Sequence, residues 1–120
     1  MDEKEILELR DGVRQAAFDR HTFLRHGHME KVYENGLGHR LRKKGLKVEP
    51  QHRLQVQEED GAVLGDLFVE NNLIVELKAC KTLVDEHTAQ VLGYLRAAGH
   101  RHALLINFGA PKIQFKKLIL

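Results

Sequence analysis

The sequence has one cysteine, two prolines and no tryptophan among its 120 residues, and these shortages exclude several classes of protein. Cys80 alone cannot form an intramolecular disulfide, a cysteine-based zinc site or a four-cysteine iron–sulfur cluster. No apolar run approaches the ~18 residues that span a membrane, and no apolar signal segment follows the acidic N-terminus. We therefore expect a soluble, cytoplasmic protein that does not contact membranes.

An excess of charge of one sign is also missing. The chain has 19 basic and 17 acidic residues, a formal net charge of +2, which is too even to indicate a nucleic-acid partner. Its length suits one domain, and 42% apolar against 30% charged residues is typical of a folded chain. With no internal repeat or linker-like segment, residues 1–120 are expected to form a single domain.

Helical periodicity dominates the first third of the chain. The first apolar stripe consists of Ile6, Leu9, Val13, Ala16 and Ala17, extended by Phe23 and Leu24. After a break at Gly27, a second stripe consists of Met29, Val32, Tyr33, Leu37 and Leu41. Gly45 ends the second helix.

After Gly45 the apolar period changes to two, which predicts strands. Residues 48–56 read as a half-exposed strand with an irregularity at Pro50, and Glu59-Asp60-Gly61 as a turn. The later elements are expected to be strands over 62–69 and 73–79, a helix over 85–98 with Ala89, Leu92 and Leu95 inward, and strands over 103–108 and 112–119. Strands 73–79 and 103–108 should be parallel, with the last strand at an edge. The predicted order is ααβββαββ, an α/β fold with a mixed sheet flanked by helices.

Three charged residues lie within the two predicted strands of the apolar hairpin 62–79. Asp66 falls in the middle of one predicted strand, and Glu76 and Lys78 leave the same face of the next. Two carboxylates can hold Mg²⁺, which activates water and stabilises charge on a phosphate, while a lysine orients the water. Alternatively, an exposed strand face carries a weak cross-strand Glu–Lys pattern. The spacing by itself leaves both interpretations open.

The strand register can be predicted from the same residues. Asp66 and Glu76 share a sheet face only if Val69 pairs with Leu73 across the three-residue loop 70–72. That register places Asp66 across from Glu76. The opposite face then consists of Val63, Leu67, Val69, Leu73, Val75 and Leu77, which would form core.

Three segments resemble the PD-(D/E)XK nuclease superfamily. Asp66 with residues 76–78 (E-L-K) resembles its signature, and residues 90–94 (Q-V-L-G-Y) look like the Q-x-x-x-Y element of its RecB-like branch. Residues 27–33 (G-H-M-E-K-V-Y) match the signature of the GxxExxY family. The resemblance runs from about Val13 to the C-terminus and implies a restriction-endonuclease-like core.

The resemblance also implies roles for individual residues. Asp66 and Glu76 would be metal carboxylates, joined by the backbone carbonyl of Leu77 and by Glu30 from the first core helix. Lys78 would be the catalytic lysine. Substrate binding would fall to Gln90 and Tyr94, which share a helix face.

Each of the remaining signals has a plainer explanation. Glu30 could be a solvated helix residue, and Tyr94 a half-buried core residue. Tyr33 continues the apolar stripe and is expected in the core. Cys80, a small side chain, is expected to be buried. The eight histidines lack zinc spacing and are expected at the surface or in loops, with His87 bordering the cleft as an alternative. The basic cluster at residues 40–44 suits a helix C-terminus or contact with phosphates.

The sequence thus predicts a single-domain nuclease that hydrolyses DNA with Mg²⁺ or Mn²⁺. RNA is a further candidate substrate, and a homodimer presenting two sites is a further hypothesis. The competing interpretation is a nuclease-fold module that binds nucleic acid or a protein partner without cutting. The presence of Asp66, Glu76 and Lys78 together favours the enzyme.

Overall fold

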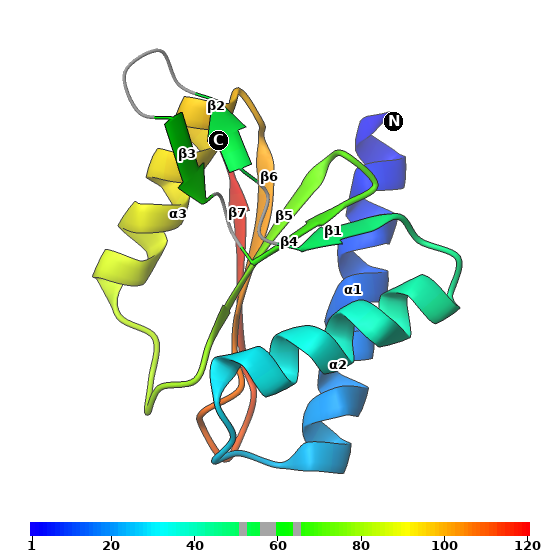
Figure 1. The fold of residues 1–120 in the computed structure, drawn as a ribbon, viewed down its shortest axis with the longest axis vertical. Coiled ribbons are helices and arrows are strands. Elements are labelled where there is room, and N and C mark those ends of the chain that lie inside the picture. The colour runs from blue at the N-terminus through cyan, green and yellow to red at the C-terminus, as the bar shows by residue number, and fades with distance from the viewer. Residues whose placement is uncertain (51–52, 56–59, 64–65) are drawn as a thin grey trace.

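A five-stranded mixed sheet with helices on both faces forms the centre of the molecule (Figure 1). The computed structural model describes residues 1–50, 53–55, 60–63 and 66–120, and for 53–55 and 60–63 only the backbone is described. The helices are α1 (Glu3–Leu24), α2 (Glu30–Lys43) and α3 (Asp85–Ala98). The strands are β1 (Val48–Pro50), β2 (Arg53–Gln55), β3 (Asp60–Val63), β4 (Leu67–Val69), β5 (Leu73–Lys78), β6 (His102–Asn107) and β7 (Gln114–Ile119).

The helix boundaries follow local chemistry. The Asp2 side chain accepts the backbone N–H of Glu5, and the Glu5 side chain accepts that of Asp2, which closes the first turn of α1. At the C-terminal end of α3, Gly99 takes a left-handed φ of 70° and ends the helix. None of the described helices combines the length and hydropathy needed to cross a membrane.

The sheet order is β1-β4-β5-β6-β7, and the predicted mixed α/β sheet is confirmed. The pair β5–β6 is parallel, β7 forms an antiparallel edge, and β6 is buried along its whole length. Val69 pairs with Leu73, so the predicted register and its three-residue loop 70–72 are also confirmed. Glu70 and Asn71 take positive φ values of 52° and 57° to close this loop.

The predicted order ααβββαββ is confirmed for the helices and the five-stranded sheet, but two of the expected strands are each divided. Instead of one strand over 48–56, β1 pairs with β4 while β2 pairs with β3 in a separate two-stranded sheet. The strand expected over 62–69 is divided into β3 and β4, with a bend at Asp66. Asp60 and Gly61, expected in a turn, belong to β3, and Val56, Glu59 and the Val63 side chain lie outside the described residues.

Two apolar clusters hold the helices against the sheet. α1 and α2 cover the face that carries Leu67, Val75 and Leu77, as the register predicts, and α3 covers the face that carries Phe68 and Ile74. Tyr33 is fully buried and stacks on Phe108, with ring centroids 4.5 Å apart, so its expected place in the core is confirmed.

Several residues expected in the apolar stripes face solvent instead. Phe23 and Met29 are 71% and 77% exposed, and Val32 and Ala89 are exposed as well. Met29 precedes α2, so helical phase does not turn it inward, and the buried face at the end of α1 is centred on His21 rather than Phe23. For α3, Val91 and Leu95 form the buried row.

Candidate active site

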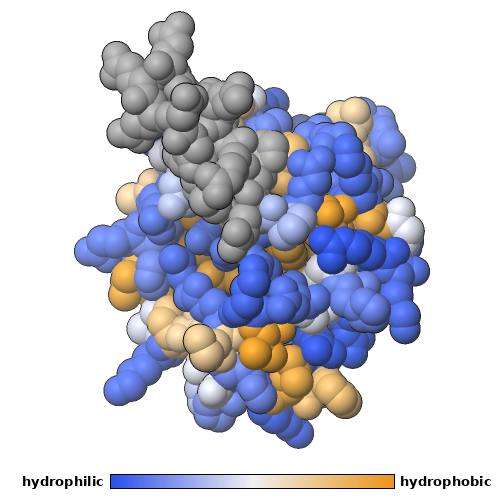
Figure 2. All heavy atoms as spheres, in the orientation of Figure 1, coloured by the Kyte–Doolittle hydropathy of each residue, from blue (hydrophilic) through white to orange (hydrophobic). Residues whose placement is uncertain are grey.

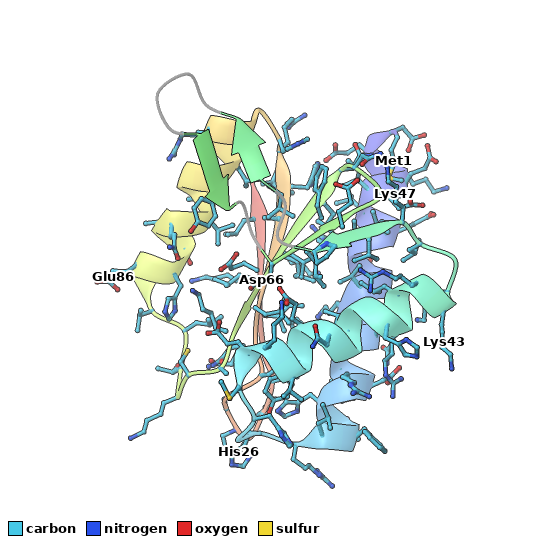
Figure 3. The ribbon with its side chains drawn as sticks, in the orientation of Figure 1. Met1, His26, Lys43, Lys47, Asp66 and Glu86 are labelled. Atoms are coloured by element: carbon cyan, nitrogen blue, oxygen red, sulfur yellow. The ribbon has the colours of Figure 1, made fainter. Side chains whose placement is uncertain are left out.

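The candidate site is built on Asp66 and two residues of β5, Glu76 and Lys78. The backbone N–H of Asp66 donates to the Val75 carbonyl at 3.1 Å, and its Oδ2 accepts the Leu77 N–H at 2.7 Å. Asp66 therefore lies at a bend, where its carboxylate accepts the Leu77 N–H of β5 in place of a backbone carbonyl. In the view of Figure 3, Asp66 lies at the centre of the molecule, between α2 and α3.

Glu76 is buried, with 7% of its surface exposed. Its Oε1 lies 3.6 Å from Nζ of Lys78, so the two side chains leave the same face of β5 as the alternation predicts. Its Oε2 is buried and has no hydrogen-bond partner among the described residues. A buried carboxylate oxygen without a partner is costly, and it is a free ligand atom for a cation.

The two carboxyl groups are electrostatically perturbed. Burial raises the pKa of Glu76 to about 7, and the nearby Asp66 carboxylate adds to the rise while Lys78 opposes it. Burial also raises the pKa of Asp66; the Leu77 N–H lowers it, and Glu34 and Glu30 raise it further. Raised carboxyl pKa values in one cluster agree with the convergence expected from the sequence.

Helix α2 adds two acidic residues to the site. Glu30, Lys31, Glu34 and Asp66 line one cavity of about 200 Å³. The Ala79 N–H, one residue beyond β5, donates to Oε1 of Glu30 at 3.4 Å, so the exposed Glu30 reaches the end of β5. Glu34 is buried and pairs with Lys31.

Helix α3 borders the same carboxylates through Tyr94. Burial raises the pKa of the Tyr94 hydroxyl, and the charges of Glu76 and Asp66 raise it while Lys78 lowers it. The ring is half-buried and packs against the cluster under α3. Gln90 lies one turn earlier and is exposed. His87, the alternative cleft residue, accepts the Val84 N–H at Nδ1 and closes the first turn of α3.

Glu34 at the candidate site and Asn107, which supports the segment after β5, are not predicted from the sequence. The signal for Glu34 is its spacing of four from Glu30, which puts both carboxylates on one helix face. The signal for Asn107 is a single amide at the end of an apolar run. Asn107 is fully buried and binds Cys80 twice, with its Oδ1 accepting the N–H at 3.0 Å and its Nδ2 donating to the carbonyl at 2.9 Å.

These bonds hold the segment that joins Lys78 to α3. Asn107 also donates to Gln114, whose Oε1 accepts the Leu83 N–H at 3.0 Å and whose Nε2 donates to Thr82. Cys80 is half-buried rather than buried as expected, because this segment lies at the surface.

Two histidines also depart from the expectation of a surface or loop position. His21 and His102 are 6% and 2% exposed. His102 lies 3.2 Å from the Glu3 carboxylate, and His21 lies 3.0 Å from the Ala110 carbonyl. Since a carbonyl oxygen only accepts hydrogen bonds, Nε2 of His21 carries the proton.

The donor set fits a hard divalent cation. Mg²⁺ needs only one or two carboxylates and completes its shell with water and phosphate oxygens. Asp66 and the unpartnered Oε2 of Glu76 supply that number. Across the part of the chain that the structure describes, no three His, Cys, Asp or Glu side chains stand close enough to hold one ion between them. The fit therefore rests on the Asp66–Glu76 pair.

Comparison with protein families identifies the fold. A family model described as the PD-(D/E)XK nuclease superfamily matches residues 7–118, and the chain therefore belongs to this superfamily. Its three helices and five-stranded mixed sheet are consistent with a restriction-endonuclease-like fold. Comparisons with curated proteins and with solved structures gave no significant match. Members of the superfamily typically use divalent metals.

The raised pKa of Glu76 predicts a pH-dependent stability in chelator. The pKa rises from 4.5 to about 7 on folding, so the unfolded chain loses this proton first as the pH increases. The free energy of unfolding should therefore be highest below pH 4.5 for this group and fall by about 3 kcal/mol as the pH rises through 7. Urea unfolding of the wild type and of Glu76→Gln across this range measures the effect. A stability difference between the two proteins that does not change with pH would contradict it.

Proposed function

We propose that the protein is a metal-dependent nuclease that hydrolyses phosphodiester bonds in DNA with Mg²⁺ or Mn²⁺. The observation that carries the proposal is the buried Glu76 carboxylate, which lies between Asp66 and Lys78 and has one oxygen free. A purely structural Glu–Lys pair would be exposed or fully satisfied. Membership of a nuclease superfamily supports the same conclusion.

Each residue has a proposed role. Asp66, Glu76 and the Leu77 carbonyl would hold the metal, which supplies an acidified water and charge stabilisation at the phosphate when bound, and Glu30 would bind a second metal or a water. The Leu77 N–H fixes the Asp66 carboxylate in orientation. Lys78 donates to the attacking water and offsets charge beside the scissile phosphate. Gln90 and Tyr94 would position the phosphate or the Lys78 ammonium.

The surface around the site suits a polar ligand. Figure 2 shows that the face presented in that view is mostly hydrophilic, with apolar side chains in small separate groups. Interfaces with nucleic acid are more polar than those between proteins. Besides DNA, the proposed partners include a second copy of the chain, and the proposed location is the cytoplasm.

Cleavage assays test the proposal directly. Supercoiled plasmid and single-stranded DNA are incubated with the protein and Mn²⁺, with Mg²⁺, and with chelator. Cleavage products should form only with metal. An RNA of the same sequence tests the substrate class. Binding of DNA without cleavage under every metal condition would overturn the enzyme and favour the nuclease-fold binding module.

A further inference from the structure

A second pocket lies at the end of α1, beside the β6–β7 turn at the bottom of Figure 1. It has a volume of about 270 Å³ and is open to solvent. Three cationic side chains line it, Arg14, Arg25 and Lys112. Its other lining residues include two phenylalanines and the buried His21, and none is acidic.

The three cations of this pocket have no ion-pair partner in the part of the chain that the structure describes. Within the described residues, no carboxylate forms an ion pair with Arg14, Arg25 or Lys112. The acidic residues nearest in sequence on α1 are engaged elsewhere. Asp11 lies 3.8 Å from Arg10 and 4.0 Å from Lys117, and Asp19 accepts the Gln15 amide at 3.0 Å. The pocket thus presents positive charge to an anionic ligand.

Arg25 is held at the pocket in a backbone conformation that glycine favours. Its φ of 64° and ψ of −169° are rarely adopted by residues with a side chain. Two hydrogen bonds fix it: its N–H donates to the His21 carbonyl at 2.7 Å, and its carbonyl accepts the Tyr33 hydroxyl at 2.6 Å. A cationic side chain is therefore retained where glycine would be less strained.

Aromatic surface lies beside these cations. Phe18 is 51% exposed, and the Arg14 guanidinium lies 4.6 Å from the centroid of the Phe115 ring. Exposed aromatic rings and guanidinium planes both stack on unpaired bases, and Arg and Lys bind the adjoining phosphates. A paired base has its faces covered by its neighbours and is not available to a single exposed ring.

The pocket is joined structurally to the candidate active site. Tyr33, whose hydroxyl fixes Arg25, lies one turn after Glu30 on α2. Its ring stacks on Phe108, and the Phe108 ring lies 6.2 Å from that of His21 in the pocket wall. The segment between Arg25 and Glu30 therefore connects the two sites along the surface.

We propose that this pocket binds one unpaired nucleotide of the substrate strand, with the phosphate at Arg25 and Lys112 and the base against Phe18. The inference rests on the proposed function for the nature of the ligand. It adds that the substrate is single-stranded, or has a single-stranded end, at this position. A volume of about 270 Å³ accommodates part of one nucleotide and not a duplex.

Fluorescence anisotropy with a labelled single-stranded oligonucleotide, in chelator so that nothing is cut, tests the pocket. Phe18→Ala should weaken binding at least ~10-fold, the loss of one base stack. Lys112→Glu should weaken it and reduce the salt dependence by about one counterion. The matched controls are Phe23→Ala, an exposed phenylalanine outside the pocket, and Lys4→Glu, an exposed lysine at the opposite end of α1 from the pocket. Both controls should bind within about twofold of the wild type.

Arg25→Gly separates binding from folding. The substitution relieves the positive φ, so the melting temperature should stay the same or rise while oligonucleotide affinity falls. Phe18→Ala should weaken the binding of a duplex of the same sequence less than it weakens the binding of the single strand. A mononucleotide and inorganic phosphate serve as competitors, and the mononucleotide should displace the oligonucleotide better.

Three results would overturn the proposal that this pocket binds a nucleotide. They are no binding of the single strand by the wild type, equal losses in pocket and control variants, or competition by phosphate equal to that of the nucleotide. Failure of the proposed function is distinguishable from these. In that case no metal supports cleavage, yet oligonucleotide binding still depends on Phe18 and Arg25.

Discussion

Asp66→Asn should abolish cleavage and weaken Mn²⁺ binding together. The amide keeps an oxygen for the Leu77 N–H, so the bend before β4 is preserved while the charge that would bind the cation is lost. We expect the rate to fall at least ~10²-fold, about 2.7 kcal/mol of barrier. Calorimetric Mn²⁺ titration and plasmid cleavage measure the two effects. Removal of the neighbouring charge should also lower the pKa of Glu76, because Asp66 contributes to its rise.

Lys78→Met is the matched variant that separates chemistry from metal binding. The lysine acts on water and phosphate rather than on the cation, so the rate should fall by ~10²-fold with metal affinity similar or slightly better. Lys78 also lowers the pKa of Glu76, so metal affinity must be compared over a pH series, at the plateau where it no longer changes with pH in either protein.

Thermal melts provide the control for both variants, since neither side chain belongs to the two apolar clusters. Cleavage by Lys78→Met at the wild-type rate would assign the activity to other residues or to a contaminant. Loss of metal binding in Lys78→Met but not in Asp66→Asn would reverse the proposed roles.

Gly109→Ala should be the most destabilising of the small substitutions. A Cβ at Gly109 would overlap the backbone of Ala79 and Cys80, and backbone atoms move less readily than a side chain. We expect the free energy of unfolding to fall by about 3 kcal/mol. Because the displaced segment follows Lys78 directly, cleavage by the protein that remains folded should fall as well.

Gly93→Ala is the control, and it should change the free energy of unfolding in the opposite direction. Gly93 lies in the exposed part of α3, and nothing would lie within 4 Å of its added Cβ. Replacing glycine inside a helix should raise the free energy of unfolding by ~0.5–1 kcal/mol. Urea denaturation of both variants measures the pair. A Gly109→Ala protein as stable as the wild type would show that the β5–α3 segment is not held against Gly109.

The sequence by itself determined the elements whose chemistry is local. Apolar periodicity and glycine breaks predicted three helices, and alternation predicted the Val69–Leu73 register, because a slip of one residue would expose the whole apolar face. The same alternation put Glu76 and Lys78 on one face of β5. These features depend on near neighbours in the chain, so the sequence contains the information that sets them.

Only the tertiary structure decided which distant groups meet. The bend at Asp66 arises because its carboxylate replaces a backbone partner of Leu77, an exchange that alternation does not encode. Glu34 joins the cavity because α2 packs beside β4 and β5, and Asn107 binds Cys80 because β6 lies parallel to β5. Burial likewise depends on every element packed around a group, which is why the rise in the pKa of Glu76 to about 7 follows from the tertiary structure.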